Sequence, residues 1–350
     1  MKWLELITNK RITIVGSMRS KKISPTILHD SFFYNEDCIT GALNHLDDNS
    51  VDLIVTDPPY GINGNNHHLH YNRNKKLVVD GYIEIPGSEY EKFSYDWIRE
   101  AARVLRPGGS IYVVSGYTNL FYVLQALQDE GLKEINHIIW KFNFGVYTRK
   151  KYVSSHYHIL FCEKPGGVRT FNVESRFGLK EANEKGRSVN YFDREDVWTI
   201  PRQYKPGKIK NQNELPDELL KKILQYSSNE GDLVCDFFMG GFSTARVAIG
   251  LNRKFVGFEL SSSIFQEKIK EIETLEPGYL FSKLRTSIVK KSLNQGKSWD
   301  SNECQKLLSR YNELLNSGKK KKDIVVILQD EFQRGYWSIE KALKKLTDLQ

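Results

Sequence analysis

Apolar positions along the chain follow two patterns, which are short runs and a helical spacing. Short apolar runs predict buried strands at Val51–Val55, Ile111–Val114, Ile135–Trp140, His158–Phe161, Leu233–Cys235 and Phe255–Phe258. Helical spacing appears at Phe93–Leu105, where Pro107-Gly108-Gly109 should stop the helix, and at Leu120–Leu127, Pro216–Tyr226 and Thr244–Gly250. Because strands and helices alternate, the sequence predicts an α/β fold with a mostly parallel sheet and helices on both faces.

Two regions depart from this alternation. Residues 165–212 are rich in Gly, Asn, Lys and Arg, and their weak periodicity predicts an insertion that does not belong to the sheet. Residues 299–346 carry apolar positions at helical spacing in three successive groups, which predicts three helices. We therefore expect an N-terminal extension over residues 1–30, an α/β domain over 31–275 and a helical module over 296–350.

The composition is that of a globular protein with a basic surface. The 350 residues carry a formal net charge of +8, which favours a polyanionic partner; a basic surface without such a partner is the alternative. No apolar stretch has the length of a signal peptide or a membrane span. The four cysteines form no Cys-x-x-Cys pair, so no zinc or other metal site is expected, and a reducing cytoplasm is favoured.

The predicted strand at Val51–Val55 runs directly into Asp57-Pro58-Pro59-Tyr60. Two successive prolines cannot continue a central strand, so this segment should form a loop at the strand's end. The segment resembles motif IV of the DNA amino-methyltransferases, which methylate the exocyclic amine of adenine or cytosine. A proline-rich turn that merely ends the strand is the alternative. No Pro-Cys dipeptide occurs, which argues against the cysteine chemistry of cytosine C5 methylation.

The resemblance gives each residue of this loop a chemical role. The amine of adenine is a poor nucleophile because its lone pair is delocalised into the ring. The Asp57 carboxylate and the Pro58 carbonyl would accept hydrogen bonds from its two N–H groups and stabilise the charge that develops. The prolines, Pro59 included, would fix the direction of that carbonyl, and Tyr60 would offer a face for stacking. The target base must be flipped out of the duplex to reach this loop.

A second motif follows the predicted strand at Leu233–Cys235. Asp236 leads into Gly240-Gly241, after which a helix should begin, and such a turn brings backbone N–H groups close to a ligand. About twenty residues further on, Glu259 ends the next predicted strand, where a carboxylate can accept hydrogen bonds from ribose hydroxyls. The Gly-x-Gly-x-x-Gly fingerprint of nicotinamide binding is absent. An ordinary turn between strand and helix is the alternative.

This turn resembles motif I of the same family, usually Asp-Pro-Phe-x-Gly-x-Gly-Thr, which implies S-adenosylmethionine as cofactor. Phe242 replaces the second glycine, so Gly240-Gly241 should make the turn alone. Asn35–Cys38 and Lys210–Pro216 resemble segments that hold the adenine ring and the methionine end of the cofactor; a charged turn and a simple helix entry are the alternatives. The resemblance assigns cofactor binding to Asp37, Cys38, Asp236, Phe238, Gly240, Gly241, Ser243, Thr244, Glu259, Lys210, Asn211 and Gln212.

The order of the motifs, with the catalytic loop first and the cofactor turn last, resembles the beta group of these enzymes. It implies a Rossmann-like S-adenosylmethionine-dependent methyltransferase domain, with a target-recognition insertion within about residues 141–211. Asp57, rather than serine, at the head of the loop favours N6-adenine. The alternatives are N4-cytosine methylation, a less favoured RNA amino-methyltransferase, and a degenerate methylase that only binds DNA.

Duplex DNA is the expected partner, whereas a cognate restriction endonuclease and a homodimer stay open and no membrane contact is expected. The three predicted helices of the tail loosely resemble a Myb/SANT helix-turn-helix, whose third helix enters the major groove; a helix bundle for protein contacts is the alternative. Basic and aromatic residues are the candidate DNA contacts, namely His68, Tyr71, Arg73, Lys75, Lys76, Arg149, Lys150, Lys151, Arg202, Lys341, Lys344 and Lys345.

Overall fold

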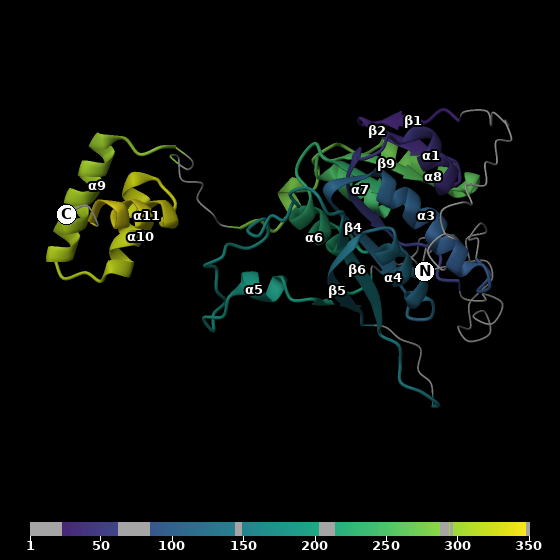
Figure 1. Cartoon of the computed structure of the whole chain (residues 1–350), viewed down its shortest axis with the longest axis horizontal. Coiled ribbons are helices and arrows are strands. Elements are labelled where there is room, and N and C mark those ends of the chain that lie inside the picture. The colour runs from purple at the N-terminus through teal and green to yellow at the C-terminus, as the bar shows by residue number, and fades with distance from the viewer. Residues whose placement is uncertain are drawn as a thin grey trace, which may run out of the picture. The chain divides into compact units, whose positions relative to one another are not determined.

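The computed structural model describes residues 23–61, 85–143, 149–202, 214–287, 294 and 297–347 (Figure 1). Contacts divide the chain into two compact units, residues 1–287 and residues 288–350. Among the described helices, none has both the length and the apolar character that crossing a membrane requires.

One sheet organises the described part of the first unit. Its strands are β1 (Thr26–Leu28), β2 (Ser31–Tyr34), β3 (Val51–Thr56), β4 (Leu105–Ser115), β5 (Lys133–Lys141), β6 (His156–Glu163), β7 (Val197–Thr199), β8 (Leu233–Asp236) and β9 (Lys254–Phe258). They lie side by side in the order β1-β2-β9-β8-β3-β4-β6-β5-β7. The centre, from β2 to β4, is parallel, whereas β6 runs antiparallel to both β4 and β5. The predicted α/β fold with a mostly parallel sheet is confirmed.

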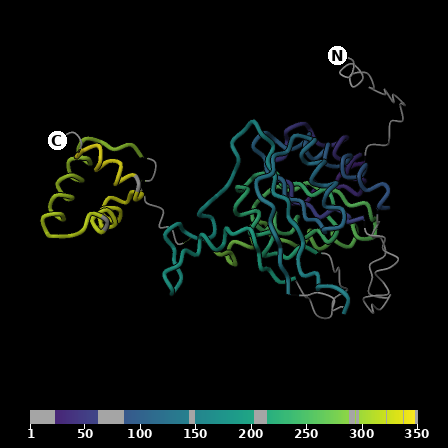
Figure 2. Tube along the Cα trace, turned by 60° about the horizontal axis from the view of Figure 1, so that its bottom comes forward, coloured from purple at the N-terminus to yellow at the C-terminus, as the bar shows by residue number. Residues whose placement is uncertain are grey.

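Helices cover both faces of this sheet (Figure 2). One core lies under α1 (Cys38–His45), α3 (Tyr90–Val104) and α4 (Leu120–Asp129). The other lies under α6 (Asp217–Ser227), α7 (Ser243–Gly250) and α8 (Ser262–Glu273). Strand β3 supplies both cores in alternation, since Leu53 and Val55 belong to one and Ile54 to the other. Such two-sided burial explains why the successive residues Leu53, Ile54 and Val55 are all apolar.

Two expectations about the borders of the sheet are wrong. Strand β1 lies within the predicted N-terminal extension, yet it pairs with β2. Strand β7 lies within the predicted insertion, yet it pairs in parallel with β5 at the sheet's edge and buries Trp198. Both strands have only three residues, too few for an alternating pattern to be visible in the sequence. A short helix, α5 (Val189–Asp193), also lies in the insertion.

Helix α3 ends at Val104, before the Pro107-Gly108-Gly109 segment that was expected to stop it, and that segment lies inside β4, which begins earlier than predicted. Strand β4 starts at Leu105, and the pairing jumps from Val51–Leu105 to Leu53–Ser110, so the segment bulges out of the ladder. Gly108 has a φ of +77°, and a Cβ there would lie 2.5 Å from the Val168 carbonyl oxygen. Its N–H donates to the Lys164 carbonyl at 2.7 Å. This glycine therefore lets the start of β4 contact the backbone that follows β6.

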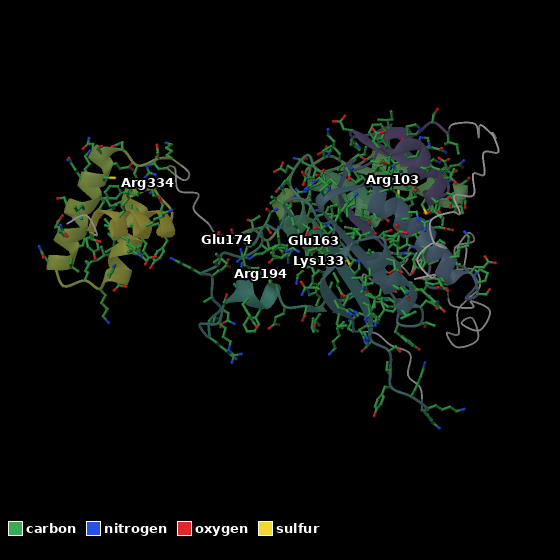
Figure 3. All side chains as sticks on the ribbon, viewed as in Figure 1. Arg103, Lys133, Glu163, Glu174, Arg194 and Arg334 are labelled. Atoms are coloured by element: carbon green, nitrogen blue, oxygen red, sulfur yellow. The ribbon has the colours of Figure 1, made fainter. Side chains whose placement is uncertain are left out.

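The described part of the second unit holds three helices, at the places that the apolar spacing predicted. They are α9 (Ser301–Asn316), α10 (Lys321–Phe332) and α11 (Tyr336–Thr347), and they enclose a core of their own. Arg334, labelled in Figure 3, is buried between the helices. It pairs with Glu303 through two hydrogen bonds and lies 4.1 Å from the ring centre of Trp299. This paired charge joins the start of α9 to the turn before α11.

Candidate active site

Three carboxylates lie at the carboxyl ends of three neighbouring strands. Asp57 follows β3, Asp236 ends β8 and Glu259 follows β9. These strands are adjacent and parallel. The chain continues from β3 to β4 on one side and from β8 to β9 on the other, so the strand order reverses here. In open α/β sheets the ligand crevice lies at such a point.

Side chains from two helical regions hold the backbone of the loop after β3. The Tyr90 hydroxyl, on α3, donates to the Pro59 carbonyl at 2.9 Å. The amide of Asn119, the residue before α4, donates to the Tyr60 carbonyl at 2.7 Å. Among the described residues, none donates a hydrogen bond to the carbonyl of Pro58. That carbonyl therefore keeps its capacity to accept one from a ligand.

The carboxylate of Asp57 lies against Tyr60, whose hydroxyl donates to its Oδ1 at 2.7 Å. Burial raises the pKa of Asp57 to about 7; the Tyr60 hydrogen bond lowers this pKa, nearby Asp236 raises it, and the charge of Arg202 lowers it. The ring of Tyr60 meets Tyr157 of β6 edge-on, with ring centres 5.3 Å apart. Because a carboxylate accepts through both oxygens, Asp57 can bind another donor while it keeps Tyr60.

Asp236 connects the two motifs. It is buried, and its Oδ1 accepts from the Thr56 hydroxyl at 2.8 Å and from the Phe238 N–H at 3.0 Å. Burial raises its pKa to about 6, although the hydrogen bonds from Phe238 and Thr56 lower it. Thr56 immediately precedes Asp57. A single buried carboxylate thus fixes the end of β3 against the glycine turn.

Glu259 closes the other side of the glycine turn. Its Oε2 accepts from the Gly240 N–H at 2.9 Å and its Oε1 from the Ser261 N–H at 2.7 Å. Burial raises the pKa of Glu259, and these backbone hydrogen bonds lower it. Each carboxylate oxygen has a second lone pair, so Glu259 can still accept from the hydroxyls of a ligand.

The expectation that Gly240 and Gly241 make the turn alone is wrong. Phe242 has a φ of +58° and a ψ of +24°, a left-handed conformation that a bulky residue rarely adopts. Its ring is buried, stacks on Phe33 at 5.9 Å and meets Phe265 edge-on at 5.8 Å. This packing offsets the strain of a conformation that costs on the order of 1–3 kcal/mol. The turn thus keeps a left-handed residue where the family motif has its second glycine.

Residues 51–271 match the DNA methylase family of the N6 and N4 amino-methyltransferases, more than half of the chain. The protein is a DNA methylase of this family. It is 28% identical to the type II methyltransferase M.HpaI of Haemophilus parainfluenzae over 244 residues, which cover 68% of this chain and 73% of that protein. It is 29% identical to M.BamHI of Bacillus amyloliquefaciens over 285 residues, covering 76% of this chain and 64% of that protein.

Solved structures agree on the fold of the methylase. A DNA modification methylase of Thermus thermophilus aligns with a TM-score of 0.50 and 23% identity, covering 70% of this chain and 96% of that one. The cytosine-N4-specific PvuII DNA methyltransferase aligns with a TM-score of 0.53 and 14% identity, covering 73% and 90%. The methyl donor of the family is S-adenosylmethionine.

The groups around the glycine turn of the methylase fit such a cofactor. The buried carboxylate of Asp236 and the half-buried one of Glu259 stand at the ends of β8 and β9, and the ring of Phe238 meets Trp97 edge-on at 5.5 Å. The Asp37 Oδ1 caps α1 by accepting from the N–H groups of Ile39 and Thr40, which leaves its other oxygen for a ligand. The side chain of Cys38 packs in the core. Ser243 and Thr244 are buried at the start of α7.

Several predicted residues lie outside the described part of the methylase. These are the candidate cofactor residues Lys210, Asn211 and Gln212, and the candidate DNA contacts His68, Tyr71, Arg73, Lys75 and Lys76.

The described candidate DNA contacts fall into three settings. Arg149, Lys150 and Lys151 are exposed before β6, next to the almost fully exposed Tyr152. On α11, three lysines are exposed opposite the buried residues of the helix, namely Lys341, Lys344 and Lys345. Arg202 is different, because aromatic rings surround it and its charge acts on Asp57. Arg202 therefore lies near the loop of Asp57 and Tyr60.

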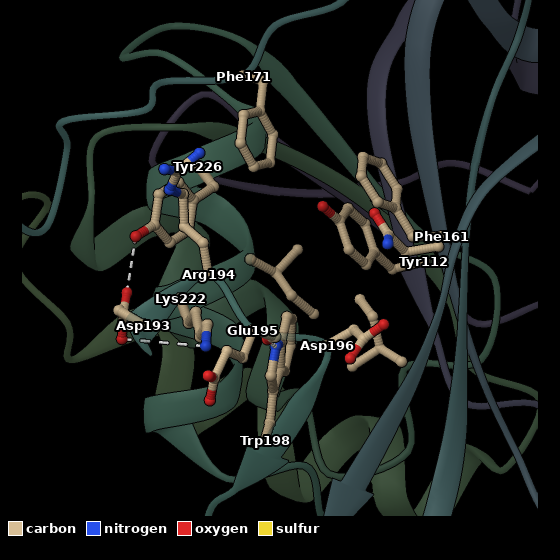
Figure 4. A pocket seen from close by; sticks show the side chains of 13 residues that line it. Tyr112, Phe161, Phe171, Asp193, Arg194, Glu195, Asp196, Trp198, Lys222 and Tyr226 are labelled. Atoms are coloured by element: carbon tan, nitrogen blue, oxygen red, sulfur yellow. Dashed lines mark hydrogen bonds and ion pairs between the residues drawn. The ribbon is translucent and has the colours of Figure 1, made fainter. Parts of the chain in front are cut away.

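A polar network ties the insertion of the methylase to α6 (Figure 4). The Asp193 Oδ2 accepts from Arg176 Nε at 2.9 Å and from the Tyr226 hydroxyl at 2.7 Å, while its Oδ1 lies 3.9 Å from Lys222 Nζ. Burial lowers the pKa of Lys222 to about 8, and Asp193 raises it. Lys222 also lies 4.3 Å from the ring centre of Trp198 in β7. The insertion is therefore anchored to helix α6, which packs on the sheet.

Sequence reasoning missed four residues that shape the catalytic loop, namely Thr56, Tyr90, Asn119 and Tyr157. Thr56 directly precedes the recognised motif, and its side chain could have been considered as a partner for Asp236. The other three belong to α3, the start of α4 and β6. No local motif marks them, because only the fold brings them to the loop.

Proposed function

We propose that this methylase transfers the methyl group of S-adenosylmethionine to the N6 amine of an adenine that is flipped out of duplex DNA at a specific sequence. The observation that carries the proposal is the arrangement at the end of β3, where the Asp57 carboxylate and the Pro58 carbonyl both keep acceptor capacity beside Tyr60. Two acceptors match the two hydrogens of an exocyclic amine. An aspartate at the head of this loop, rather than serine, supports adenine over cytosine.

In the proposed reaction, one set of residues binds the cofactor and another binds the amine. Bound S-adenosylmethionine supplies an electrophilic methyl group, and Asp236, Glu259 and the turn at Gly240 are the groups proposed to hold it. Asp57 and Pro58 orient the amine and stabilise the positive charge that grows on its nitrogen. A pKa of about 7 makes Asp57 a stronger base than an ordinary carboxylate, so it can also take the proton that the methylated amine must lose.

The relatives support a further part of the proposal. M.HpaI and M.BamHI are named as type II methyltransferases. We therefore place this methylase in a restriction–modification system, with a cognate endonuclease as its partner and cytoplasmic DNA as its substrate.

Methyl transfer to unmethylated bacterial DNA tests the proposal. The purified methylase is incubated with this DNA and S-adenosylmethionine; one part of the DNA is digested to nucleosides for mass spectrometry, and the methylated positions are mapped by sequencing of the other part. N6-methyldeoxyadenosine at one recurrent sequence is the expected product. N4-methyldeoxycytidine instead would overturn the adenine assignment while keeping the family chemistry, and no methylated nucleoside would overturn both.

A further inference from the structure

Arg202 occupies an aromatic cage at the ends of β5 and β6. Its guanidinium carbon lies 4.5 Å from the ring centre of Phe142, 4.8 Å from that of Tyr157 and 6.0 Å from that of Trp140. A guanidinium held over aromatic faces gains cation–π attraction and loses little freedom when it binds a ligand. The cage therefore fixes the plane in which its N–H groups point.

The backbone before Arg202 is also fixed. The Ile200 N–H donates to the Lys141 carbonyl at 3.1 Å, and the indole N–H of Trp140 donates to the Ile200 carbonyl at 2.8 Å. These bonds extend the pairing of β7 with β5 by one residue beyond Thr199. The backbone two residues before Arg202 is therefore held at the edge of the sheet, and this fixes where the Arg202 side chain starts.

The cage adjoins the catalytic loop. Tyr157, one wall of the cage, meets Tyr60 edge-on at 5.3 Å, and the charge of Arg202 acts on Asp57. The Nε–H of Arg202 is buried, and no described group accepts a hydrogen bond from it. A buried N–H without an acceptor costs free energy, so this donor is expected to find an acceptor in the working complex.

We propose that Arg202 contacts the flipped base, and that its guanidinium donates to a ring nitrogen next to the amine that is methylated. This inference rests on the proposed function. Arginine carries only donors, and the adenine amine is flanked by two ring acceptors, N1 and N7. Cytosine has an acceptor on one side of its amine and a C–H on the other, while guanine and thymine carry a carbonyl in place of the amine. Against guanine and thymine either contact is selective, because the amine is replaced by a carbonyl; against cytosine Arg202 is selective when it donates to N7, since the N1 side has an equivalent acceptor in cytosine.

Adenine analogues that lack one ring nitrogen test the contact. The substrate is a duplex oligonucleotide with the mapped target sequence, in which the target adenine is replaced by 7-deazaadenine or 1-deazaadenine. Both analogues keep the exocyclic amine. With the unmodified chain, one analogue should lower kcat/KM on the order of tenfold to a hundredfold, which corresponds to a hydrogen bond from a charged donor. The sensitive analogue identifies the nitrogen that is contacted.

The decisive readout is the same comparison in Arg202→Met. This variant should be slow on natural adenine and should show no further loss with the sensitive analogue, because the donor is already gone. A merely structural role would leave the analogue effect intact, and that result would overturn the proposal. Equal rates of the unmodified chain on all three bases would overturn it as well. Failure of the proposed function would appear earlier, as a lack of N6-methyladenine in the mapping experiment.

Two variants complete the design. Arg187→Met removes an exposed arginine of the same insertion and should keep the full analogue effect. Arg202→Lys keeps the positive charge in the cage but loses the planar guanidinium. Because that charge lowers the pKa of Asp57, the pH at which kcat falls on the acid side should stay near that of the unmodified chain. The effect of the sensitive analogue should become smaller. If Arg202→Met does not fold, as judged by its thermal unfolding, the lysine variant decides, and an undiminished analogue effect in it contradicts the contact.

Discussion

At the residue scale, the site holds carboxyl groups in buried surroundings that disfavour their charged form. Asp57 and Asp236 both lie in surroundings that raise the pKa of their side chains, to about 7 and about 6. Burial is the largest cause in each case. The same burial that destabilises the charged carboxylates makes them strong hydrogen-bond acceptors for a ligand. Function and stability are therefore in conflict at these residues.

Replacement of Asp57 by alanine should abolish methyl transfer, with a loss of at least about a hundredfold in kcat, because an acceptor for the amine disappears. Binding of S-adenosylmethionine should persist, because the proposed cofactor contacts lie at the glycine turn. Calorimetric titration with the cofactor and a tritium-transfer assay measure the two effects. Turnover close to that of the unmodified chain would remove Asp57 from the mechanism.

Replacement of Asp57 by asparagine should stabilise the protein at pH 8. The folded-state pKa, about 7, lies above the ordinary value of 3.8. Between these values the folded chain binds the proton more tightly than the unfolded chain, so stability falls as the pH rises through this window. The gain in unfolding temperature should therefore be largest at pH 8 and shrink by more than half at pH 5.

The control for this comparison is Glu184→Gln, which removes one negative charge at an exposed position. Its unfolding temperature should differ little from that of the unmodified chain at either pH. If Asp57→Asn raised the unfolding temperature equally at both pH values, the ionisation of Asp57 would not be what destabilises the folded chain.

At the scale of elements, the turn between β8 and α7 combines strain and packing at Phe242. Phe242→Ala should remove the ring and leave the strain, and a loss of about 3–5 kcal/mol in the free energy of unfolding is expected. Phe242→Gly removes both, so it should be more stable than the alanine variant by about 1 kcal/mol. Urea unfolding of this matched pair checks the difference. An alanine variant as stable as the glycine variant would mean that the left-handed conformation carries no strain.

The sequence predicted elements well where an apolar pattern was long, as in β3 and α3, and poorly where it was short, as in β1 and β7. It also singled out Asp57, Asp236 and Glu259, which lie at the ends of three neighbouring strands, because each follows or ends an apolar strand. The side chains that donate hydrogen bonds to the backbone of the loop after β3 could not be predicted in this way. Tyr90 and Asn119 reach the loop only through the packing of α3 and α4 against the sheet.

Phe242 shows a second kind of limit. A motif comparison treats it as the loss of a glycine, and therefore predicts an altered turn. The chain keeps the left-handed conformation because Phe33 and Phe265 provide a place for the ring. Those partners come from β2 and α8, far away in the sequence, so the compensation is invisible in the motif itself.

At the scale of the whole molecule, the unit of residues 288–350 has its own core, and Lys341, Lys344 and Lys345 are exposed on its third helix. If this unit binds DNA, removal of residues 296–350 should weaken DNA affinity and lower its salt dependence. Each lost phosphate contact should reduce the slope of log K against log salt by about 0.9. Cofactor binding should survive.

Fluorescence anisotropy with a labelled duplex at several salt concentrations measures that slope. A triple substitution of these lysines by glutamine gives the matched control, because it keeps the helices and removes only the charges. If the slope and the methylation rate are unchanged in both variants, the unit has a role other than contact with DNA.

The order of strands in the sheet also constrains how the protein is made. The central strand β3 lies between β4 and β8, and the hydrogen bond from Thr56 to Asp236 spans 180 residues. A ribosome releases the chain from its N-terminus, so β3 emerges long before β8 and β9 exist. Until then its edge and its apolar side chains lack their partners, and such edges aggregate readily. Pairings this distant also slow folding. The strand that leads to Asp57 therefore gains its neighbour on the Asp236 side only late in synthesis, and chaperones that cover exposed strands should matter most during this interval.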